Sequence, residues 1–313
     1  MAHIYTIQNK KGLIPYSNEP SASQISNKAE LCVEIYSIDE FMKVDLGDDD
    51  IEEAISLLSR SQGSSINTLP DCFIGSLSFP SKIDSAFHFV HFGFYLNPKR
   101  LIFIDSSEVS RDVLVSLKTL EKLPQISTLR ILYEFIKYFI EDDPIYLSDT
   151  EKYLSDAEES ILEQRTNISN QELLSHRRKL IKYDRFYQQL TDISSIIAKD
   201  EYLIFSKDDR RLFRLLGQQT ERLLQRAQYL KEYSMQLREL HQMQVDAEQN
   251  RTIQWLTVIT TLVVPLTLIT SWYGMNFSHM PELEWEYGYA VVIVVCIILV
   301  IAQLLFFKKR KWL

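Results

Sequence analysis

The chain has 313 residues, with 34 Lys and Arg against 42 Asp and Glu, and a formal net charge of −8. This acidic balance argues against a nucleic-acid-binding protein, which needs a basic surface to meet phosphates. Its three cysteines show no paired spacing, which disfavours a disulfide-framed secreted fold. Only 8 glycines are present and no Gly-rich phosphate loop occurs, so we expect no nucleotide, no cofactor and no enzyme.

Residues 1–105 mix strand-like and helical patterns. Strands are predicted where β-branched and aromatic residues are concentrated, at 3–7, 29–38, 72–79, 88–96 and 100–105. Helices are predicted between them at 38–41 and 48–58. This mixture predicts an α/β layer structure.

Helical patterns dominate after residue 110. Helices are predicted at 110–122, 126–142, 148–166, 170–198 and 207–271. The last has leucines at helical spacing and no proline from Lys207 to Val264. We expect a body at 1–206 and a stalk helix at 207–252 that continues into a membrane span. The alternative is two stacked helices broken near Gly217, since glycine disfavours helix.

Two charge-free stretches near the C-terminus are long enough to cross a membrane. Residues 253–277 and 287–307 contain no Asp, Glu, Lys or Arg, and Trp255 and Trp272 stand near the ends of the first run. A helix needs about 20 apolar residues to span the hydrocarbon core, and tryptophan is favoured at its interfaces. The sequence therefore predicts a multi-pass membrane protein.

The flanks of these spans predict their orientation. The tail 308–313 begins with four basic residues, whereas the loop 278–286 contains three glutamates and no Lys or Arg. Basic segments remain in the cytoplasm, so we expect both termini and the acidic body inside and the loop outside.

The first span carries polar side chains on one face. Residues at steps of three and four on this face are Asn250, Ile253, Thr257, Thr260, Val264, Thr267 and Ser271. Such a stripe suits a water-filled path, although hydroxyl groups can also hold helices together. Two helices cannot enclose a path, so several copies would surround one axis, with the uniformly apolar second spans facing lipid.

Three motifs at the C-terminal end resemble a known family. YGMN ends the first span at 273–276, MPEL follows at 280–283, and the chain closes with KKRKWL. Together they closely resemble the CorA family of magnesium transporters. The resemblance implies a funnel-shaped homopentamer in the lipid bilayer of a bacterial inner membrane, with an α/β cytoplasmic domain, a long stalk helix and a two-helix transmembrane domain. It also implies influx of Mg²⁺ down the electrochemical gradient.

The resemblance assigns the selectivity filter to Gly274, Met275 and Asn276. Asn276 would present a ring of amide oxygens to the ion, Gly274 its carbonyl, and Met275 would support the turn by packing. Mg²⁺ gives up its water reluctantly, and neutral amide oxygens can bind these waters without trapping the ion.

The resemblance also assigns roles along the first span. Asn250 and Thr267 match polar pore rings, while Ile253, Leu256 and Val264 stand at apolar constrictions where a gate would close by dewetting. The expected pore-lining residues are Asn250, Ile253, Leu256, Thr257, Thr260, Val264, Thr267 and Ser271.

The acidic residues outside the filter can be interpreted in two ways. The carboxylates of Glu282, Glu284 and Glu286 could attract cations to the entrance. For Glu284 and Glu286 the alternative is a solvated loop.

Regulation in this family resembles negative feedback by cytoplasmic Mg²⁺ bound between subunits. Of two stalk positions where some members place acids, Glu239 is acidic and Leu215 is not. Glu239 is therefore either a ligand or a solvated charge. The acidic stretch with Asp48, Asp49 and Asp50 offers another regulatory site or a solvated face.

Two rivals to a Mg²⁺ channel remain open. The first is a zinc, cobalt or nickel transporter of the same superfamily, some of whose members keep the same filter letters. The second is a non-conducting membrane receptor that binds a ligand through its acidic body.

Overall fold

The computed structural model describes residues 3–8, 12–15, 31–44, 63–80, 89–105, 107–117, 126–163, 170–276, 280, 285–310 and 312. The chain divides into two compact units, Met1–Leu237 and Arg238–Leu313.

The first unit contains a seven-stranded mixed sheet. Its strands are β1 (His3–Gln8), β2 (Gly12–Pro15), β3 (Cys32–Tyr36), β4 (Ser65–Thr68), β5 (Phe73–Pro80), β6 (Phe89–Leu96) and β7 (Arg100–Ile104), in the spatial order β2-β1-β3-β7-β6-β5-β4. The β3–β7 pair is parallel, with Val33 opposite Leu101, and the other pairs are antiparallel. A mixed sheet confirms the predicted α/β class.

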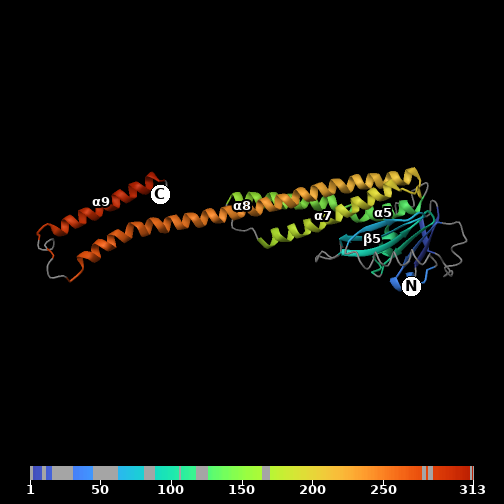
Figure 1. Ribbon diagram of the computed structural model, residues 1–313, viewed down its shortest axis with the longest axis horizontal. Helices are drawn as coiled ribbons and strands as arrows, with labels where there is room; N and C mark the ends of the chain where they lie inside the picture. The colour runs from blue at the N-terminus through green and yellow to red at the C-terminus, as the bar shows by residue number, and fades with distance from the viewer. Residues whose placement is uncertain are drawn as a thin grey trace. The chain divides into compact units, whose positions relative to one another are not determined.

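The helices follow the sheet in the chain. They are α2 (Ile38–Phe41), α4 (Val109–Ser116), α5 (Thr128–Ile140), α6 (Asp143–Leu162), α7 (Asn170–Lys199), α8 (Lys207–Tyr273) and α9 (Gly288–Lys309) (Figure 1). Ser127 caps α5, because its hydroxyl oxygen accepts from the Arg130 backbone N–H at 3.1 Å. The same hydroxyl donates to Asp209 at 2.7 Å, which ties the start of α5 to the first turn of α8.

Both faces of the sheet are covered, so β5 is buried along its whole length. On one face, Phe79 stacks on Phe139 of α5 with ring centroids 4.2 Å apart and meets the edge of Phe186 of α7 at 5.7 Å. On the other face, Ile74 belongs to a core cluster with Phe41 of α2. Successive side chains on a strand point to opposite faces, so β5 contributes to both cores.

A buried ion pair joins β3 to β7. The Arg100 guanidinium donates to both carboxylate oxygens of Glu34, at 2.9 and 2.8 Å. Burial alone would raise the pKa of the Glu34 carboxyl, but the hydrogen bonds and charge of Arg100 outweigh it and hold that pKa below its usual value. Burial and the neighbouring Glu34 carboxylate raise the pKa of the Cys32 thiol to about 12, so this cysteine stays protonated.

The predicted elements agree with the observed ones, with specific exceptions. The strands β2 and β4 were not predicted, because their sequences GLIP and SINT are only four residues long and contain no aromatic residue. Helix α6 begins at Asp143, five residues before the predicted start, because Pro144 lies in its first turn, where proline is tolerated. The predicted helix at 48–58 lies outside the described residues.

Helix α8 is continuous over 67 residues, so the alternative of a break near Gly217 is wrong. At 1.5 Å per residue such a helix is about 100 Å long. Gly217 faces α7, and a Cβ there would lie 3.4 Å from the Cβ of Ser194. Tertiary packing against α7 therefore holds the helix through its weakest residue.

Candidate functional site

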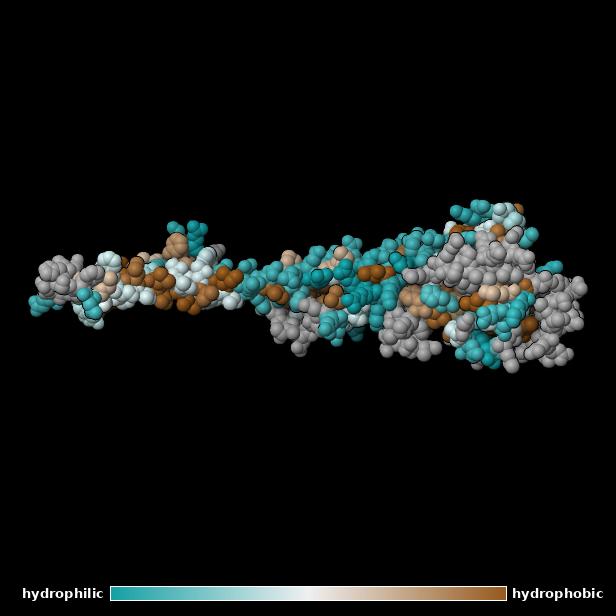
Figure 2. Space-filling view, turned by 60° about the horizontal axis from the view of Figure 1, so that its bottom comes forward, coloured by the Kyte–Doolittle hydropathy of each residue, from teal (hydrophilic) through white to brown (hydrophobic). Residues whose placement is uncertain are grey.

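The second unit consists of two apolar helices. The C-terminal part of α8 and the whole of α9 are long and apolar enough to cross a membrane, and only 6% of the residues in each apolar window are buried. Brown apolar side chains predominate on these helices, whereas teal polar ones predominate on the preceding part of α8 (Figure 2). A soluble protein would bury such surfaces, so these helices need lipid or other copies of the chain around them.

The apolar part of α8 has two unlike faces. Val258 is 2% exposed and shares its side of the helix with the half-buried Leu262 and Pro265. The expected constriction residues Ile253, Leu256 and Val264 are 52%, 65% and 57% exposed. The remaining expected pore-lining residues are also exposed: Asn250, Thr257, Thr260, Thr267 and Ser271. A single chain thus leaves this entire face uncovered.

The threonine hydroxyls on the exposed face donate to the helix itself. Thr257 donates to the Ile253 carbonyl at 2.8 Å, Thr260 to Leu256 at 2.6 Å and Thr267 to Val263 at 2.9 Å. A hydroxyl whose hydrogen is used in this way keeps its oxygen lone pairs free to accept. Water bound to a cation points its hydrogens outward and needs acceptors, so these oxygens suit a hydrated cation.

Gly274, Met275 and Asn276 directly follow the last residue of α8. The Gly274 N–H still bonds to the Thr270 carbonyl at 3.0 Å, and the Met275 N–H to Trp272 at 3.4 Å. The Asn276 side chain is exposed and makes no hydrogen bond to other described residues. Met275 is 45% exposed.

The acidic residues outside this segment are only partly described. Glu286 is exposed and precedes α9, and Glu239 is exposed on α8, while Leu215 is 49% exposed. Glu282, Glu284 and the aspartates Asp48, Asp49 and Asp50 lie outside the described residues. In the described part of the chain, no group of three or more His, Cys, Asp or Glu side chains is placed to hold a metal ion.

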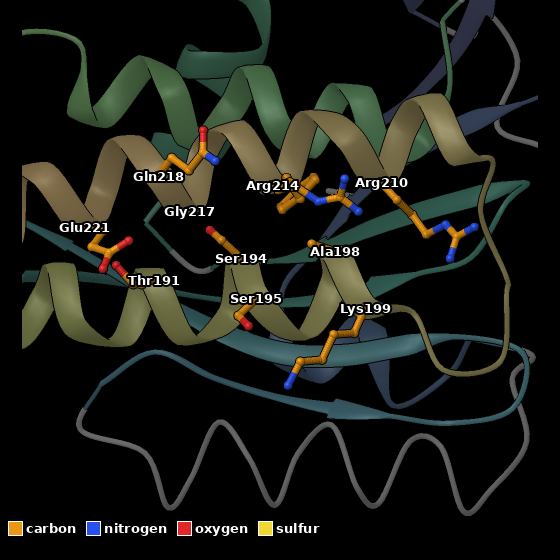
Figure 3. A pocket seen from close by; sticks show the side chains of 11 residues that line it. Thr191, Ser194, Ser195, Ala198, Lys199, Arg210, Arg214, Gly217, Gln218 and Glu221 are labelled. Carbon is orange, nitrogen blue, oxygen red and sulfur yellow. The ribbon is translucent and has the colours of Figure 1, made fainter.

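A separate groove of about 470 Å³ lies between α7 and α8 in the first unit. Figure 3 shows Arg210 and Arg214 projecting from α8 and Lys199 from the end of α7, while Glu221 lies beside Thr191 at the other end. Three cationic groups repel a divalent cation, so this groove does not suit the sensing ion.

One polar residue of the second unit was missed by sequence reasoning. The second span is not uniformly apolar as predicted, because Gln303 lies within it and donates through Nε2 to the Thr261 carbonyl of α8 at 3.0 Å. A lone amide in a charge-free stretch is the signal that marks it, because polar groups inside a membrane need partners.

Residues 41–309 match the family model described as "CorA-like Mg2+ transporter protein". The chain is 30% identical over 137 residues to the "Cobalt/magnesium transport protein CorA" of Thermotoga maritima, which is 44% of this chain and 39% of that protein. It is 50% identical over 70 residues to the "Magnesium transport protein CorA" of Helicobacter pylori, 22% of each chain. The matched segments thus span less than two fifths of these relatives' own length.

The fold is also similar to that of a solved structure. The complete structure of the CorA magnesium transporter from Methanocaldococcus jannaschii superposes with a TM-score of 0.78 at 17% identity, covering 100% of this chain and 99% of that one. This likeness confirms the predicted combination of an α/β domain, a long helix and two C-terminal apolar helices. Since the family model covers most of the chain, the protein belongs to the CorA-like Mg²⁺ transporters, membrane proteins with two spans and not enzymes.

Proposed function

We propose that five copies of this chain form a channel that admits Mg²⁺ through a membrane. The observation that carries this proposal is the exposed face of α8 that runs from Asn250 to Ser271 and leads to Asn276. Two helices cannot enclose a path, whereas five copies of this face around one axis would line one. The family membership and the printed names of the relatives, which are magnesium and cobalt transport proteins, support this reading.

The lining would alternate between polar and apolar rings. Thr257, Thr260 and Thr267 would offer acceptor oxygens to the waters of a hydrated ion, because their hydroxyl hydrogens are already bonded to the helix. Ile253, Leu256 and Val264 would form constrictions that close by losing water. The pore would then be wet only where the apolar rings are held apart.

The entrance would select the ion by its water shell. Asn276 amide oxygens and Gly274 carbonyls from five copies would accept hydrogen bonds from the waters of Mg²⁺, with Met275 supporting them against neighbouring copies. Mg²⁺ releases water reluctantly, so neutral acceptors bind it without trapping it. Glu282, Glu284 and Glu286 would raise the local cation concentration.

Membrane potential would drive the transport. An inside-negative potential contributes about 2.3 kcal/mol per charge per 100 mV, and twice that for a divalent ion. The basic tail 308–313 would keep both termini in the cytoplasm, and the bacterial relatives favour an inner bacterial membrane. Influx then requires no nucleotide.

Cytoplasmic Mg²⁺ would regulate the gate. Glu239 is exposed and therefore free to meet a neighbouring copy across a bound ion. The acidic stretch with Asp48, Asp49 and Asp50 is the other candidate. Occupied sites would hold the copies together and keep the apolar rings closed.

Ion uptake by purified protein in liposomes tests the proposal. We expect Mg²⁺ influx that rises with an inside-negative potential and falls at least tenfold in Asn276→Ala. Gln254→Ala is the matched control, because it removes an exposed amide from α8 outside the proposed lining. Absence of Mg²⁺ flux in the unmodified protein contradicts the channel, and full activity of Asn276→Ala removes the filter assignment.

Cobalt is the second candidate ion, because the Thermotoga maritima relative is named for both metals. Parallel assays with Mg²⁺, Co²⁺ and Zn²⁺ distinguish these substrates. If none of the three ions enters and crosslinking stops at dimers, the non-conducting receptor is favoured instead.

A further inference from the structure

Pro265 interrupts the hydrogen bonding of α8 inside the membrane segment. Each backbone N–H of a helix donates to the carbonyl four residues earlier, and proline has no N–H. The helix continues through Pro265, so the carbonyl of Thr261 has no donor from its own helix. No lipid chain can supply one, and an unsatisfied carbonyl is costly in the hydrocarbon core.

Gln303 of α9 supplies that donor. Its Nε2 lies 3.0 Å from the Thr261 carbonyl oxygen. The opposite amide orientation would place two acceptors against each other, so the geometry itself assigns the NH₂ group to this contact. Gln303 thus gives the Thr261 carbonyl the donor that proline removed, while its own Oε1 has no hydrogen-bond partner among the described residues.

The surroundings leave Gln303 well suited to this contact. It lies in a hollow of about 640 Å³ between the two helices, lined among others by Leu299, Ala302 and Phe306. The nearby Thr261 hydroxyl already donates to the Thr257 carbonyl at 2.7 Å. The amide is therefore a polar group set among mostly apolar neighbours at the turn of α8 that proline has opened.

We propose that Gln303 is a positioning residue that ties the second span to the first at the turn opened by Pro265. Thr261 lies four residues before Pro265 and so on the same side of α8. The hollow that holds Gln303 reaches Thr261 and Thr257, at the edge of the proposed lining, whereas Thr260, Val264 and Thr267 do not border it. The contact of α9 with α8 at Thr261 therefore determines which face of α8 remains open to other copies of the chain. An effect of Gln303 on transport depends on the proposed channel function. The hydrogen bond between Gln303 and Thr261 does not depend on it.

A double-mutant cycle tests the contact, because Pro265→Ala restores the missing backbone donor. Gln303→Leu alone should lower the rate of Mg²⁺ uptake by about threefold, a size typical of one interhelical hydrogen bond in a membrane. In the Pro265→Ala background the same substitution should change the rate less than about 1.5-fold, since Thr261 no longer needs the amide. Equal effects in both backgrounds would overturn the proposal.

Infrared spectroscopy tests the same contact without transport. The protein is produced with threonine that carries ¹³C at its backbone carbonyl, which gives the threonine carbonyls a separate amide I band. The contribution of residue 261 to this band is identified as the part that is lost in Thr261→Ser. Gln303→Leu should shift this band to higher wavenumber in the Pro265 protein and leave it in place in Pro265→Ala. An unshifted band overturns the proposal even if the protein transports Mg²⁺, and a shifted band supports it even if no ion is transported.

Leu305→Ala serves as the control for perturbing α9, because this residue is 62% exposed. It should leave the band of residue 261 unchanged. A shift as large as that in Gln303→Leu would mean that the band reports general loosening of α9, and the specific role of Gln303 would fail.

Discussion

The two units of this chain handle apolar side chains in opposite ways. In the first unit, aromatic and aliphatic residues of the sheet and helices pack on one another, and Leu132, Phe135 and Ile136 of α5 are fully buried. In the second unit, Ile298 and Leu305 of α9 belong to the most apolar helix of the chain and are 60% and 62% exposed. Apolar side chains of the first unit are covered by the protein itself, whereas those of the second unit need lipid or other copies of the chain to cover them.

The contrast extends to polar groups. The first unit buries a charge by pairing it, as in Glu34 with Arg100. The second unit satisfies its backbone within each helix and adds a side-chain contact, from Gln303, where proline has removed a donor. Water can hydrate the groups of the first unit when they separate, whereas lipid cannot satisfy an unpaired backbone group in the second.

The largest expected effect concerns the buried ion pair. Arg100→Leu should lower the free energy of unfolding by about 3–5 kcal/mol, because it leaves the Glu34 carboxylate buried without its cation. Arg226→Leu is the matched control. Arg226 pairs with Glu151 at 2.8 Å, but the two side chains are 38% and 42% exposed, so the loss of this pair should lower the free energy of unfolding by less than about 1 kcal/mol. Urea unfolding in detergent measures both, and equal losses would contradict the contrast.

The next effect compares the same substitution in the two units. Leu132→Ala should destabilise the protein by about 2–5 kcal/mol, because it leaves a cavity in the core beside the sheet. Leu305→Ala should cost less than about 0.5 kcal/mol if lipid or detergent surrounds this side of α9. Unfolding monitored by tyrosine and tryptophan fluorescence provides the comparison. A loss at Leu305 as large as that at Leu132 would instead show that neighbouring copies cover α9.

A smaller effect is expected from two glycines of the first unit. Gly217→Ala should stabilise the protein by about 0.5–1 kcal/mol, because alanine favours helix and its Cβ would make an ordinary contact with Ser194. Gly75→Ala should destabilise it, since a Cβ there would lie 2.6 Å from the ring of Phe94. Thermal unfolding distinguishes the two signs, and destabilisation at both positions would mean that α7 and α8 leave no room at Gly217.

The smallest effect is a dependence on pH. Burial, and then the charge of Lys179, lower the pKa of His176, whose ring stacks on Tyr153 at 4.2 Å. The His176 imidazole therefore binds a proton more readily in the unfolded chain than in the folded chain. The contribution of the neutral His176 to the stability of the fold is complete above a pH of about 6.5, the ordinary pKa of histidine. It is lost as the pH falls through the lowered pKa of the folded state.

His176→Phe keeps the ring and removes the proton-binding site. Melting temperatures measured from pH 7.5 to 5.5 should fall less steeply in this variant than in the unmodified protein. Parallel slopes would show that another group carries the dependence.

Much of the architecture could be predicted from local patterns. The spans, the stalk and most helices follow from charge-free stretches, regular leucine spacing and the absence of proline. The strands β2 and β4 could not be predicted this way, because each has only four residues and no aromatic side chain, and each pairs with its neighbouring strand, β1 or β5. The buried pair of Glu34 and Arg100 was also invisible, since its members are 66 residues apart and meet through the parallel β3–β7 pair.

Some features of the candidate site also follow from the sequence, whereas others depend on tertiary packing. The polar stripe and the YGMN motif are properties of spacing along one helix, so the sequence by itself determined which residues lie on that face and where the helix ends. Only the tertiary structure decided which side of α8 meets α9. That choice depends on a carbonyl freed by Pro265 and an amide 42 residues away, and two groups so distant along the chain are brought together by packing, which periodicity does not encode.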